Sequence, residues 1–434
     1  MGRPAISFVM PSLNGQNRLP EIIGDLAASG VQDGEIIIVD DGSAEPPTSL
    51  ALGSPDMPVQ VIVNGTNIGP GASRNKAIAA SEADYVCFVD DDDMVEAGAF
   101  SGFDPDALDG ADIVLMRFLD ENNGVMSNDV LVDGLIGEPA GHALLSSYRQ
   151  SLLRHEITPL QCQAYLFRRA MLLENDVRFP PTWLAEDQVF LTKALLAAET
   201  AAVWPTPYYR YQTRPASLKT SASAERCHDF CRALDDLLRF LAARDVADEM
   251  LRTIARQSAE RLVRLFCIRF VALDAADQSD LVRVLTERTG ADASLPPWIE
   301  MPADMLGVVE ELNATGVTAR SLTQTAGRLL FSGIPATSGN NFIYCCGPMG
   351  RAVRAHLARH GMTVSGFLDD NAAFKGQQFE GCPVFDLDDA QRNGALEGAS
   401  VIIANPQPNI ADKIGAKLSS FRDRHAVAFD IVVP

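Results

Sequence analysis

The sequence predicts an α/β protein in which a helical region separates two regions of alternating strands and helices. Short apolar runs alternate with helical patterns through the first half of the chain. The apolar spacing is helical from 223 to 286, and strand patterns resume after residue 341. Such alternation favours a mostly parallel sheet covered by helices on both faces. We therefore divide the chain into residues 1–220, 221–332 and 333–434.

The elements of the first region follow from apolar runs of strand length and from helical periodicity. We expect strands and helices, in chain order, at Ile6–Met10, Leu19–Ala28, Glu35–Val39, Val59–Val63, Gly71–Ala80 and Tyr85–Val89. Ligands of open parallel sheets bind beyond the carboxyl ends of the strands. Polar residues follow three of these strands, so we expect one crevice lined by Pro11–Asn14, Asp40–Ser43 and Asp90–Asp93.

The rest of the chain predicts helices and then a second α/β region. A proline-bearing break at Leu295–Pro302 and a linker at Gly333–Asn341 separate the two. After the linker we expect strands and one helix at Phe342–Cys346, Arg351–His360, Val364–Leu368 and Val401–Ala404.

Composition excludes several classes of protein. With 36 Lys and Arg against 57 Asp and Glu, the 434-residue chain has a formal charge of −21, which argues against a nucleic-acid partner. No apolar run reaches the roughly 18 residues of a membrane span, and the N-terminus lacks a secretory signal, so we expect a cytoplasmic protein. The eight cysteines lack paired CxxC spacing and are expected to be reduced thiols. We interpret Cys227, His228 and Cys231 as a buried helical face rather than a metal site.

The helical region is locally basic, since residues 208–270 carry 12 basic and 8 acidic side chains. Five arginines alternate there with apolar residues: Arg252, Arg256, Arg261, Arg264 and Arg269. One interpretation is a packed helix with a solvated basic face. The alternative is a peripheral contact with anionic lipid or a lipid-linked acceptor at the inner face of the membrane.

The four consecutive carboxylates of Asp90–Asp93 repel one another, so their position after a buried strand calls for a compensating positive charge. A hard divalent cation, Mg²⁺ or Mn²⁺, prefers such oxygen ligands and commonly also binds substrate phosphates. A solvated acidic turn is the alternative. At the second strand end, Asp40 and Asp41 either accept hydrogen bonds from a base or ribose, or cap the turn at Gly42 and Ser43.

Taken together and in order, these pieces resemble glycosyltransferase family 2, the inverting nucleotide-sugar transferases of GT-A fold. The matching residues are Pro11, Ser12 and Asn14; Val39–Ser43; Asn67, Gly69, Gly71, Arg74 and Asn75; and Val89–Asp92. Leu13 departs from the pattern, because the family often has an aromatic residue there.

The resemblance implies a role for each matching position. Asp41 would contact the uracil of a UDP-sugar, and Arg74 would help to hold the nucleotide together with Pro11, Ser12 and Asn14. The Asp-x-Asp motif of Asp90, Asp91 and Asp92 would bind ribose and metal, with Asp92 as the main metal ligand and Asp90 as a second. The metal would neutralise charge on the departing diphosphate.

The family also places a Glu-Asp pair, followed by an aromatic, at the acceptor side, and Glu186, Asp187 and Phe190 fit this pattern. Asp187 would be the general base that deprotonates an acceptor hydroxyl, and Glu186 would orient it or touch the acceptor. On its own, the pair is a feature of a helix N-terminal turn. Further on, Tyr208–Tyr211 with Pro215, Ser217 and Leu218 resembles a segment that closes over the diphosphate, although a packed aromatic strand explains it equally.

The C-terminal region contains Cys345-x-Gly347-x-x-Gly350, which has two of the three glycines of a dinucleotide fingerprint and is followed by Asp369. The region resembles the Rossmann-like domain of sialic-acid-type sugar O-acyltransferases through Phe367–Asp370 and Gly381–Val384. The resemblance implies a nucleotide at this domain and a regulatory, binding or scaffolding role.

The leading hypothesis is a metal-dependent inverting glycosyltransferase that moves a sugar from a nucleotide-sugar, a UDP-sugar, to a hydroxyl of a glycan or lipid-linked acceptor. Synthesis of bacterial cell-surface polysaccharide is the usual setting of the family. One alternative is an NAD-dependent sugar-nucleotide oxidoreductase centred on the C-terminal region. Another is a non-catalytic nucleotide-sugar-binding protein, which would have no need of a base at Asp187.

Overall fold

The computed structural model forms two compact units, each described below by itself. The first comprises Met1–Ser217, Arg232–Ala259 and Ala293–Ile299, and the second comprises Leu218–Cys231, Glu260–Asp292 and Glu300–Pro434. The structure describes residues 4–48, 57–120, 124–125, 131–211, 224–286, 301–314, 317–331, 334, 339–371, 374–405, 408–425 and 427–433. The sequence-predicted break at Leu295–Pro302 and linker at Gly333–Asn341 lie largely outside these residues.

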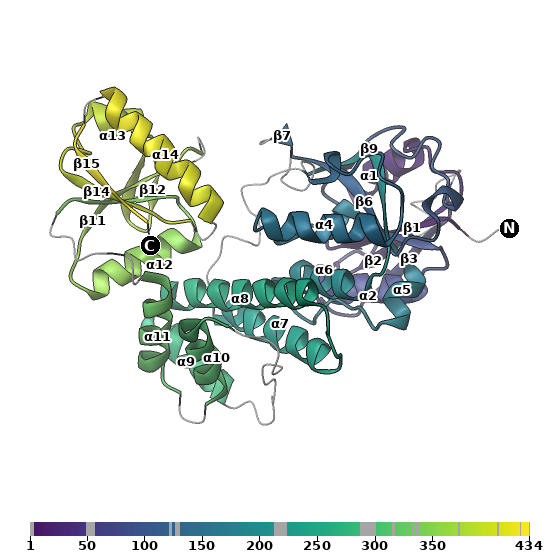
Figure 1. Cartoon of the computed structure of the whole chain (residues 1–434), viewed down its shortest axis with the longest axis horizontal. Helices are drawn as coiled ribbons and strands as arrows, with labels where there is room; N and C mark the ends of the chain where they lie inside the picture. The colour runs from purple at the N-terminus through teal and green to yellow at the C-terminus, as the bar shows by residue number, and fades with distance from the viewer. Residues whose placement is uncertain are drawn as a thin grey trace. The chain divides into compact units, whose positions relative to one another are not determined.

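The first unit is built on a nine-stranded sheet in the order β3-β2-β1-β4-β8-β6-β9-β5, with β7 paired to β6 (Figure 1). Its strands are β1 (Ile6–Ser12), β2 (Gly34–Asp40), β3 (Val59–Val63), β4 (Tyr85–Phe88), β5 (Met94–Val95), β6 (Ile113–Asp120), β7 (Gly124–Val125), β8 (Tyr165–Arg168) and β9 (Ala201–Tyr211). The first four of these strands are parallel neighbours. β8 runs antiparallel to both β4 and β6.

Helices pack along this sheet: α1 (Leu19–Ala28), α2 (Pro70–Ala80), α4 (His142–Arg154), α5 (Arg169–Glu174) and α6 (Glu186–Ala197). α2 packs against β1 and β2, and α5 packs against β8. An aromatic cluster fills the space near α6, where the rings of Phe179 and Phe190 stack at 3.9 Å and Phe88 meets both edge-on. These rings support the polar edge of the sheet described below.

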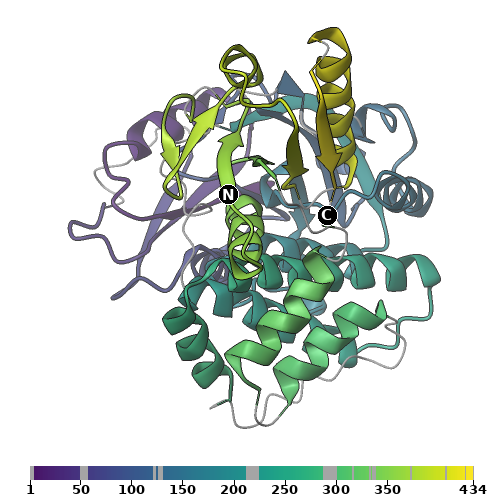
Figure 2. The same ribbon diagram turned by 90° about the vertical axis from the view of Figure 1, so that its left-hand side faces the viewer.

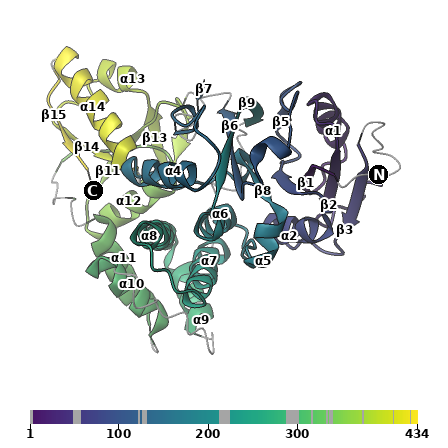
Figure 3. The same cartoon turned by 45° about the vertical axis from the view of Figure 1, so that its right-hand side comes forward.

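Two long helices follow the first sheet, α7 (Ala224–Ala242) and α8 (Glu249–Ala272), and the boundary between the units falls within each. In the first unit, α6 lies beside both (Figure 3). The Gln188 amide on α6 donates to the Ser258 carbonyl of α8 at 2.9 Å, and Lys193 forms an ion pair with Asp236 of α7. The chain after β9 therefore continues into helices that cover α6.

The second unit contains a six-stranded sheet in the order β12-β13-β11-β10-β14-β15. Its strands are β10 (Asn341–Tyr344), β11 (Val364–Leu368), β12 (Gln378–Phe379), β13 (Cys382–Phe385), β14 (Ala399–Ile403) and β15 (Phe429–Val432). All neighbours are parallel except the edge pair of β12 and β13. In Figure 2 this sheet faces the viewer, with the long yellow helix α14 (Pro408–His425) beside it.

The remaining helices of the second unit are α9 (Ala275–Thr286), α10 (Ala303–Asn313), α11 (Ala319–Phe331), α12 (Pro348–Arg359) and α13 (Leu387–Arg392). α11 contacts α9, α10 and α12. The buried core of the sheet is formed by side chains such as Phe342, Leu368, Val401 and Leu418. No helix in the described ranges combines the length and the apolar character that crossing a bilayer requires.

The sequence predictions of an α/β protein with a helical middle and a second, largely parallel sheet are confirmed. The prediction of a mostly parallel first sheet holds for β3, β2, β1 and β4, and β6 and β9 also pair in parallel. The exception beside β4 is β8, which lies between β4 and β6 and runs antiparallel to both.

Candidate functional site

Three strand ends bring polar residues to one edge of the first sheet. Ser12 lies opposite Asp40 in the parallel register of β1 and β2, and Val9 of β1 lies opposite Phe88 of β4. The segments that follow these strands therefore leave the sheet at the same edge, as the sequence analysis predicts.

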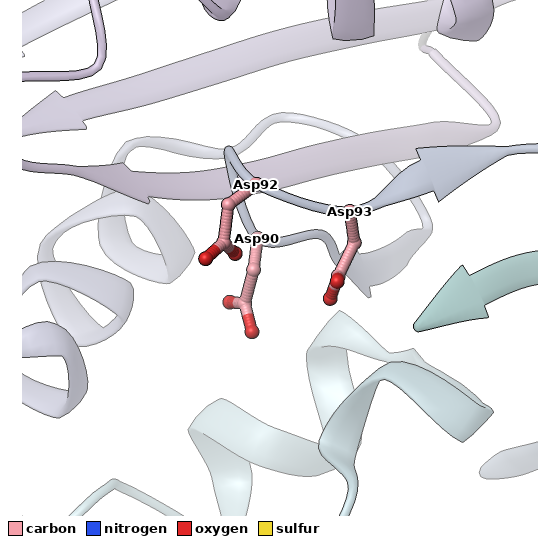
Figure 4. Close-up of side chains that lie close together, drawn as sticks. All are labelled: Asp90, Asp92 and Asp93. Atoms are coloured by element: carbon pink, nitrogen blue, oxygen red, sulfur yellow. The ribbon is translucent and has the colours of Figure 1, made fainter. Parts of the chain in front are cut away.

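The acid run forms a cluster of three carboxylates at this edge. Oxygen atoms of Asp90, Asp92 and Asp93 all lie within 4.8 Å of one another (Figure 4). Asp93 is 7% exposed and accepts a hydrogen bond from the Tyr209 hydroxyl at 2.5 Å. Within the described ranges, these three side chains are the ones whose ligand atoms lie close enough together to hold a metal ion. Its donors are all oxygens, which fits Mg²⁺ or Mn²⁺.

Asp91, which the sequence analysis groups with its neighbours, turns away from that cluster. Its carboxylate accepts from the Arg18 guanidinium at 3.0 Å and from the Ser12 hydroxyl at 2.5 Å. A Cβ on Gly15 would lie 2.0 Å from Asp91 Oδ2 and 2.2 Å from Ser12 Oγ, so only glycine leaves room for this contact. Asp91 and Ser12 thus bind each other and fix the loop after β1.

Arg74 joins the acid run to the Glu186–Asp187 pair. The guanidinium lies 2.8 Å from Asp90, 2.9 Å from Asp187 and 3.6 Å from Glu186. Its side chain is 4% exposed, and its guanidinium carbon lies 5.3 Å from the centre of the Phe179 ring. Burial lowers the pKa of Arg74, but the surrounding carboxylates outweigh it and raise the pKa well above its usual value. Arg74 therefore stays charged.

Glu186 and Asp187 begin α6, directly after Ala185, whose φ of 62° is left-handed. Burial, then the neighbouring charge of Asp187, raises the pKa of Glu186 to about 8. The Glu186 side chain is 14% exposed and that of Asp187 is 21% exposed, so the latter has more access to a ligand. A carboxyl group with a raised pKa beside a second carboxyl group is a common arrangement at acid–base sites.

Asp41 holds the loop before α2 through three hydrogen bonds. Its Oδ1 accepts from the Asn64 amide and the Ile68 backbone N–H, both at 2.9 Å, and its Oδ2 accepts from the Gly69 backbone N–H at 2.9 Å. The neighbouring Asp40 accepts from the Ser43 N–H through Oδ2, whereas its buried Oδ1 has no hydrogen-bond partner among the described atoms. Asp40 therefore adds a polar atom to this edge.

The remaining predicted residues at the end of β1 and in the loop that follows it are more exposed than Asp40 and Asp41. Asn14 has a left-handed φ of 52°, and its backbone N–H donates to the Ser43 hydroxyl at 2.7 Å. Pro11 pairs with Val39 inside the sheet, and Leu13 is 41% exposed. The first two strand ends are thus tied together by a direct hydrogen bond.

Three contributors to this edge, Arg18, Gln163 and Cys162, were missed by sequence reasoning. Arg18 neutralises Asp91, Gln163 donates to Asp90 at 2.7 Å, and the Cys162 thiol donates to Asp187 at 3.4 Å. The Tyr209 hydroxyl bonds to both Asp93 and the backbone N–H of Asp90. A run of four acids signals that a cation must lie nearby, but it does not indicate which arginine supplies the charge.

The aromatic segment Tyr208–Tyr211 forms the end of strand β9. Tyr208 and Tyr209 are completely buried within β9, and the Tyr208 hydroxyl bonds to the Gln163 carbonyl. The remaining residues of the sequence-predicted closing segment, Pro215, Ser217 and Leu218, lie outside the described residues.

The helical region agrees with the simpler interpretations. Cys227 and Cys231 are buried at 0% and 4% exposure on α7, and His228 is 9% exposed, as expected for a buried helical face. On α8, Arg252, Arg256, Arg261 and Arg264 are half-buried and Arg269 is buried. This burial agrees with a packed helix, and a contact with anionic membranes stays a prediction.

In the second unit, the glycine-bearing loop follows β10 and precedes α12. Cys345 has a left-handed φ of 93°, which only glycine adopts without strain. A Cβ on Gly350 would lie 2.3 Å from the Cys345 carbonyl, whereas a Cβ on Gly347 would meet open space. The Asp369 carboxylate accepts from the Cys346 N–H at 2.6 Å. A nucleotide at this loop stays a prediction.

Comparison with known proteins identifies a family for the N-terminal region. Residues 7–175 match the sequence profile described as Glycosyl transferase family 2. The N-terminal region therefore belongs to glycosyltransferase family 2. That match ends before Glu186 and Asp187, and the roles expected of these two residues stay predictions.

Several curated proteins are similar to this chain over a longer stretch than residues 7–175. The poly(ribitol-phosphate) beta-N-acetylglucosaminyltransferase TarS of Staphylococcus aureus is 25% identical over 70% of this chain and 50% of its own length. The succinoglycan biosynthesis protein ExoO of Rhizobium meliloti is 24% identical over 57% of this chain and 72% of its own length. A poly(ribitol-phosphate) beta-glucosyltransferase of Bacillus spizizenii is 26% identical over 56% of this chain and 38% of its own length. The chain thus spans half or less of the two poly(ribitol-phosphate) transferases.

Among solved structures, the crystal structure of S. aureus TarS 1–349 in complex with UDP-GlcNAc superposes with a TM-score of 0.55. The superposition covers 88% of this chain and 99% of that chain, at 20% sequence identity. A likeness at this level concerns the fold, so the first sheet is GT-A-like, as the sequence resemblance implies.

Proposed function

We propose that the protein is a metal-dependent inverting glycosyltransferase that uses a UDP-sugar donor. The observation that carries the proposal is the position of Arg74, which contacts the acid run at Asp90 and the Glu186–Asp187 pair at once. One buried cation thereby holds a cluster suited to metal and diphosphate next to a carboxylate suited to an acceptor hydroxyl. The family membership of the N-terminal region and the UDP-GlcNAc named with the TarS structure support the donor class.

Asp90, Asp92 and Asp93 would hold the metal, and Mn²⁺ or Mg²⁺ there would offset the charge that develops on the leaving diphosphate. Asp187 takes the proton of the acceptor hydroxyl as the hydroxyl oxygen bonds to the anomeric carbon. The bond from that carbon to the diphosphate oxygen breaks, and UDP leaves with the electron pair. The Arg74 guanidinium lies 2.9 Å from the Asp187 carboxylate and fixes the position of this base.

The acceptor in this proposal is a hydroxyl of a cell-surface glycan or a polyol-phosphate polymer. The names of TarS and of the Bacillus spizizenii protein specify poly(ribitol-phosphate), and that of ExoO specifies succinoglycan biosynthesis. These are bacterial polymers rich in hydroxyl groups, which is the chemistry that a general base at Asp187 would serve.

The test is a thermal-shift panel of nucleotides and nucleotide-sugars, with and without Mn²⁺, on the wild type and on Asp92→Ala. A ligand at 100 times its dissociation constant stabilises the protein by about 2.7 kcal/mol. We expect a UDP-sugar to stabilise the wild type only with Mn²⁺, and Asp92→Ala to lose the response. A metal-independent response, or an equal response in the variant, would overturn the metal-dependent donor site. The best UDP-sugar is then used in an assay of UDP release with candidate polymers.

For the second unit, we infer a Rossmann-like domain that binds a nucleotide or serves as a scaffold. The open space at Gly347 and the tight packing at Gly350 support this inference, because the second and third glycines of a dinucleotide fingerprint have these two uses. A thermal shift by NAD or UDP that persists in Asp92→Ala and disappears in Gly347→Val is the expected result for nucleotide binding. A response that Gly347→Val retains would place the nucleotide elsewhere.

A further inference from the structure

The second unit contains a groove that the proposed transfer reaction does not use. It has a volume of about 960 Å³ and lies among α8, α9, α11 and α12. This volume is within the range of small-molecule sites, which measure roughly 300 to 1,000 Å³. Its apolar lining includes Val271, Ala275 and Phe331.

The ionisable side chains that line the groove are all basic. Arg320 and Arg328 come from α11, His356 and Arg359 come from α12, and His360 follows α12 directly. The described lining includes no Asp or Glu. This is unexpected in a chain that carries 57 acidic residues and only 36 lysines and arginines.

These arginines also lack acidic partners elsewhere in the described part of the chain. Arg328 donates to the Thr325 hydroxyl at 3.1 Å and Arg359 donates to the Val271 carbonyl at 3.1 Å, and both of these acceptors are uncharged. No ion pair joins Arg320, Arg328 or Arg359 to a described carboxylate, whereas the nearby Arg283 of α9 pairs with Asp280.

Positive charges that gather without a counter-charge raise the energy of the groove. Burial, then the charges of His360 and Arg359, lowers the pKa of His356 to about 4. Burial also lowers the pKa of Arg359 below its usual value. An anion in the groove would relieve both effects, and the planar fork of an arginine matches phosphate oxygens in geometry and charge.

We propose that this groove, lined by Arg320, Arg328, His356, Arg359 and His360, binds a phosphate-bearing ligand. Three arginines and two histidines provide more donors than a single carboxylate could accept, so a group with several anionic oxygens fits best. The apolar part of the lining would contact the carbon skeleton of the ligand. Two sources share this chemistry: a small molecule with terminal phosphates, and a polymer linked by phosphodiesters.

The experiment uses the full chain with ¹³C-labelled histidine and follows the imidazole signals by NMR in excess EDTA, which removes metal from the acid cluster. The probes are inorganic tripolyphosphate and a glycerol-phosphate hexamer. The chain has six histidines, so two signals report on the groove and four serve as internal references: His142, His155, His228 and His425.

We expect the His356 and His360 signals to move on titration with at least one probe, while the reference signals stay in place. The variant Arg320→Gln/Arg328→Gln should bind the same probe at least tenfold more weakly. Both side chains are exposed, so this variant is expected to fold. The matched control is Arg283→Gln, which removes an exposed arginine outside the groove and should leave affinity within twofold.

Tighter binding of the hexamer would identify a phosphodiester polymer as the source, and tighter binding of tripolyphosphate would identify a small phosphorylated molecule. The proposal is overturned if neither probe moves the two groove signals at 10 mM. It is equally overturned if the double variant binds as tightly as the wild type, or if Arg283→Gln weakens binding to the same extent. None of these outcomes depends on transferase activity.

Discussion

Arg74 and Asp187 lie 113 positions apart in the sequence, yet the guanidinium Nη1 and the carboxylate Oδ1 are 2.9 Å apart. The same guanidinium reaches Asp90 through its other nitrogen. One side chain of α2 therefore joins this helix to the first turn of α6. Disturbing that side chain should affect both the acid cluster and the Glu186–Asp187 pair.

Replacing Arg74 by lysine is expected to reduce stability and activity together. A lysine keeps the charge but cannot direct two separate nitrogens at Asp90 and Asp187, so one carboxylate loses its partner. Losing one member of a buried ion pair costs about 3–5 kcal/mol. Urea unfolding measures this loss. The control Arg178→Lys changes an arginine that is 71% exposed and should cost less than about 1 kcal/mol. Equal stability of the two variants would contradict the bridging role.

Asp187→Asn is expected to separate catalysis from donor binding. The amide keeps the size of the side chain but cannot accept the acceptor's proton, so kcat should fall by roughly 10²- to 10⁴-fold. The dissociation constant of the UDP-sugar should change by less than about threefold, because Asp187 faces the acceptor in our proposal. UDP release and calorimetry provide the two measurements. Retained turnover would remove Asp187 as the base.

Gly15→Ala is expected to destabilise the loop after β1. The new methyl group would overlap Asp91 Oδ2 and Ser12 Oγ, and Asp91 is held by Arg18 and cannot move freely. Overpacking of this kind costs roughly 1–3 kcal/mol. Gly24→Ala is the matched control, because Gly24 lies within α1 and its added methyl meets nothing within 4 Å. That substitution should stabilise by about 0.5–1 kcal/mol. Thermal unfolding of both variants tests the contrast.

The pKa of Glu186 predicts a dependence of stability on pH. Because the folded-state pKa is raised from 4.5 to about 8, the folded protein holds a proton that the unfolded chain releases between these values. The free energy of unfolding should therefore fall as pH rises from about 5 to 8. Glu186→Gln removes this titration. Between about pH 5 and 8, the free energy of unfolding of this variant should therefore fall by at least about 1 kcal/mol less than that of the wild type.

Urea unfolding of the metal-free wild type and of Glu186→Gln at several pH values measures this difference. Glu174→Gln is the control, because Glu174 lies at the end of α5, outside the site. Parallel pH profiles for the wild type and Glu186→Gln would show that Glu186 is ionised throughout.

Local patterns predicted the strands that lie side by side in the parallel half of the first sheet. These strands could be predicted because a buried parallel strand is a continuous apolar run. β3 has the predicted bounds, β1 ends two residues later than predicted, and β2 is one residue longer at each end. The antiparallel strand β8 carries no comparable local signal for its direction. Its pairing with β4 joins Tyr85 to Arg168, and only the packing of distant segments determines such a pair.

The same distinction applies to the site. The acid run and the Glu186–Asp187 pair could be found because each is a short motif with its own chemistry. Arg18 and Gln163 could not, since each lies in an unremarkable segment and reaches the acids from more than 70 positions away. The position of Asp91 outside the metal-like cluster also depends on its contact with Arg18, which the motif alone does not reveal.

The loop that Asp41 holds is ordered before any ligand arrives. Three donors, from Asn64, Ile68 and Gly69, already bond to the carboxylate and restrain the loop. Immobilising a free side chain on binding costs roughly 0.5–1.5 kcal/mol, so a preformed loop spares several such losses. Association of a nucleotide should accordingly proceed in one kinetic phase whose rate rises linearly with nucleotide concentration, as for a rigid receptor.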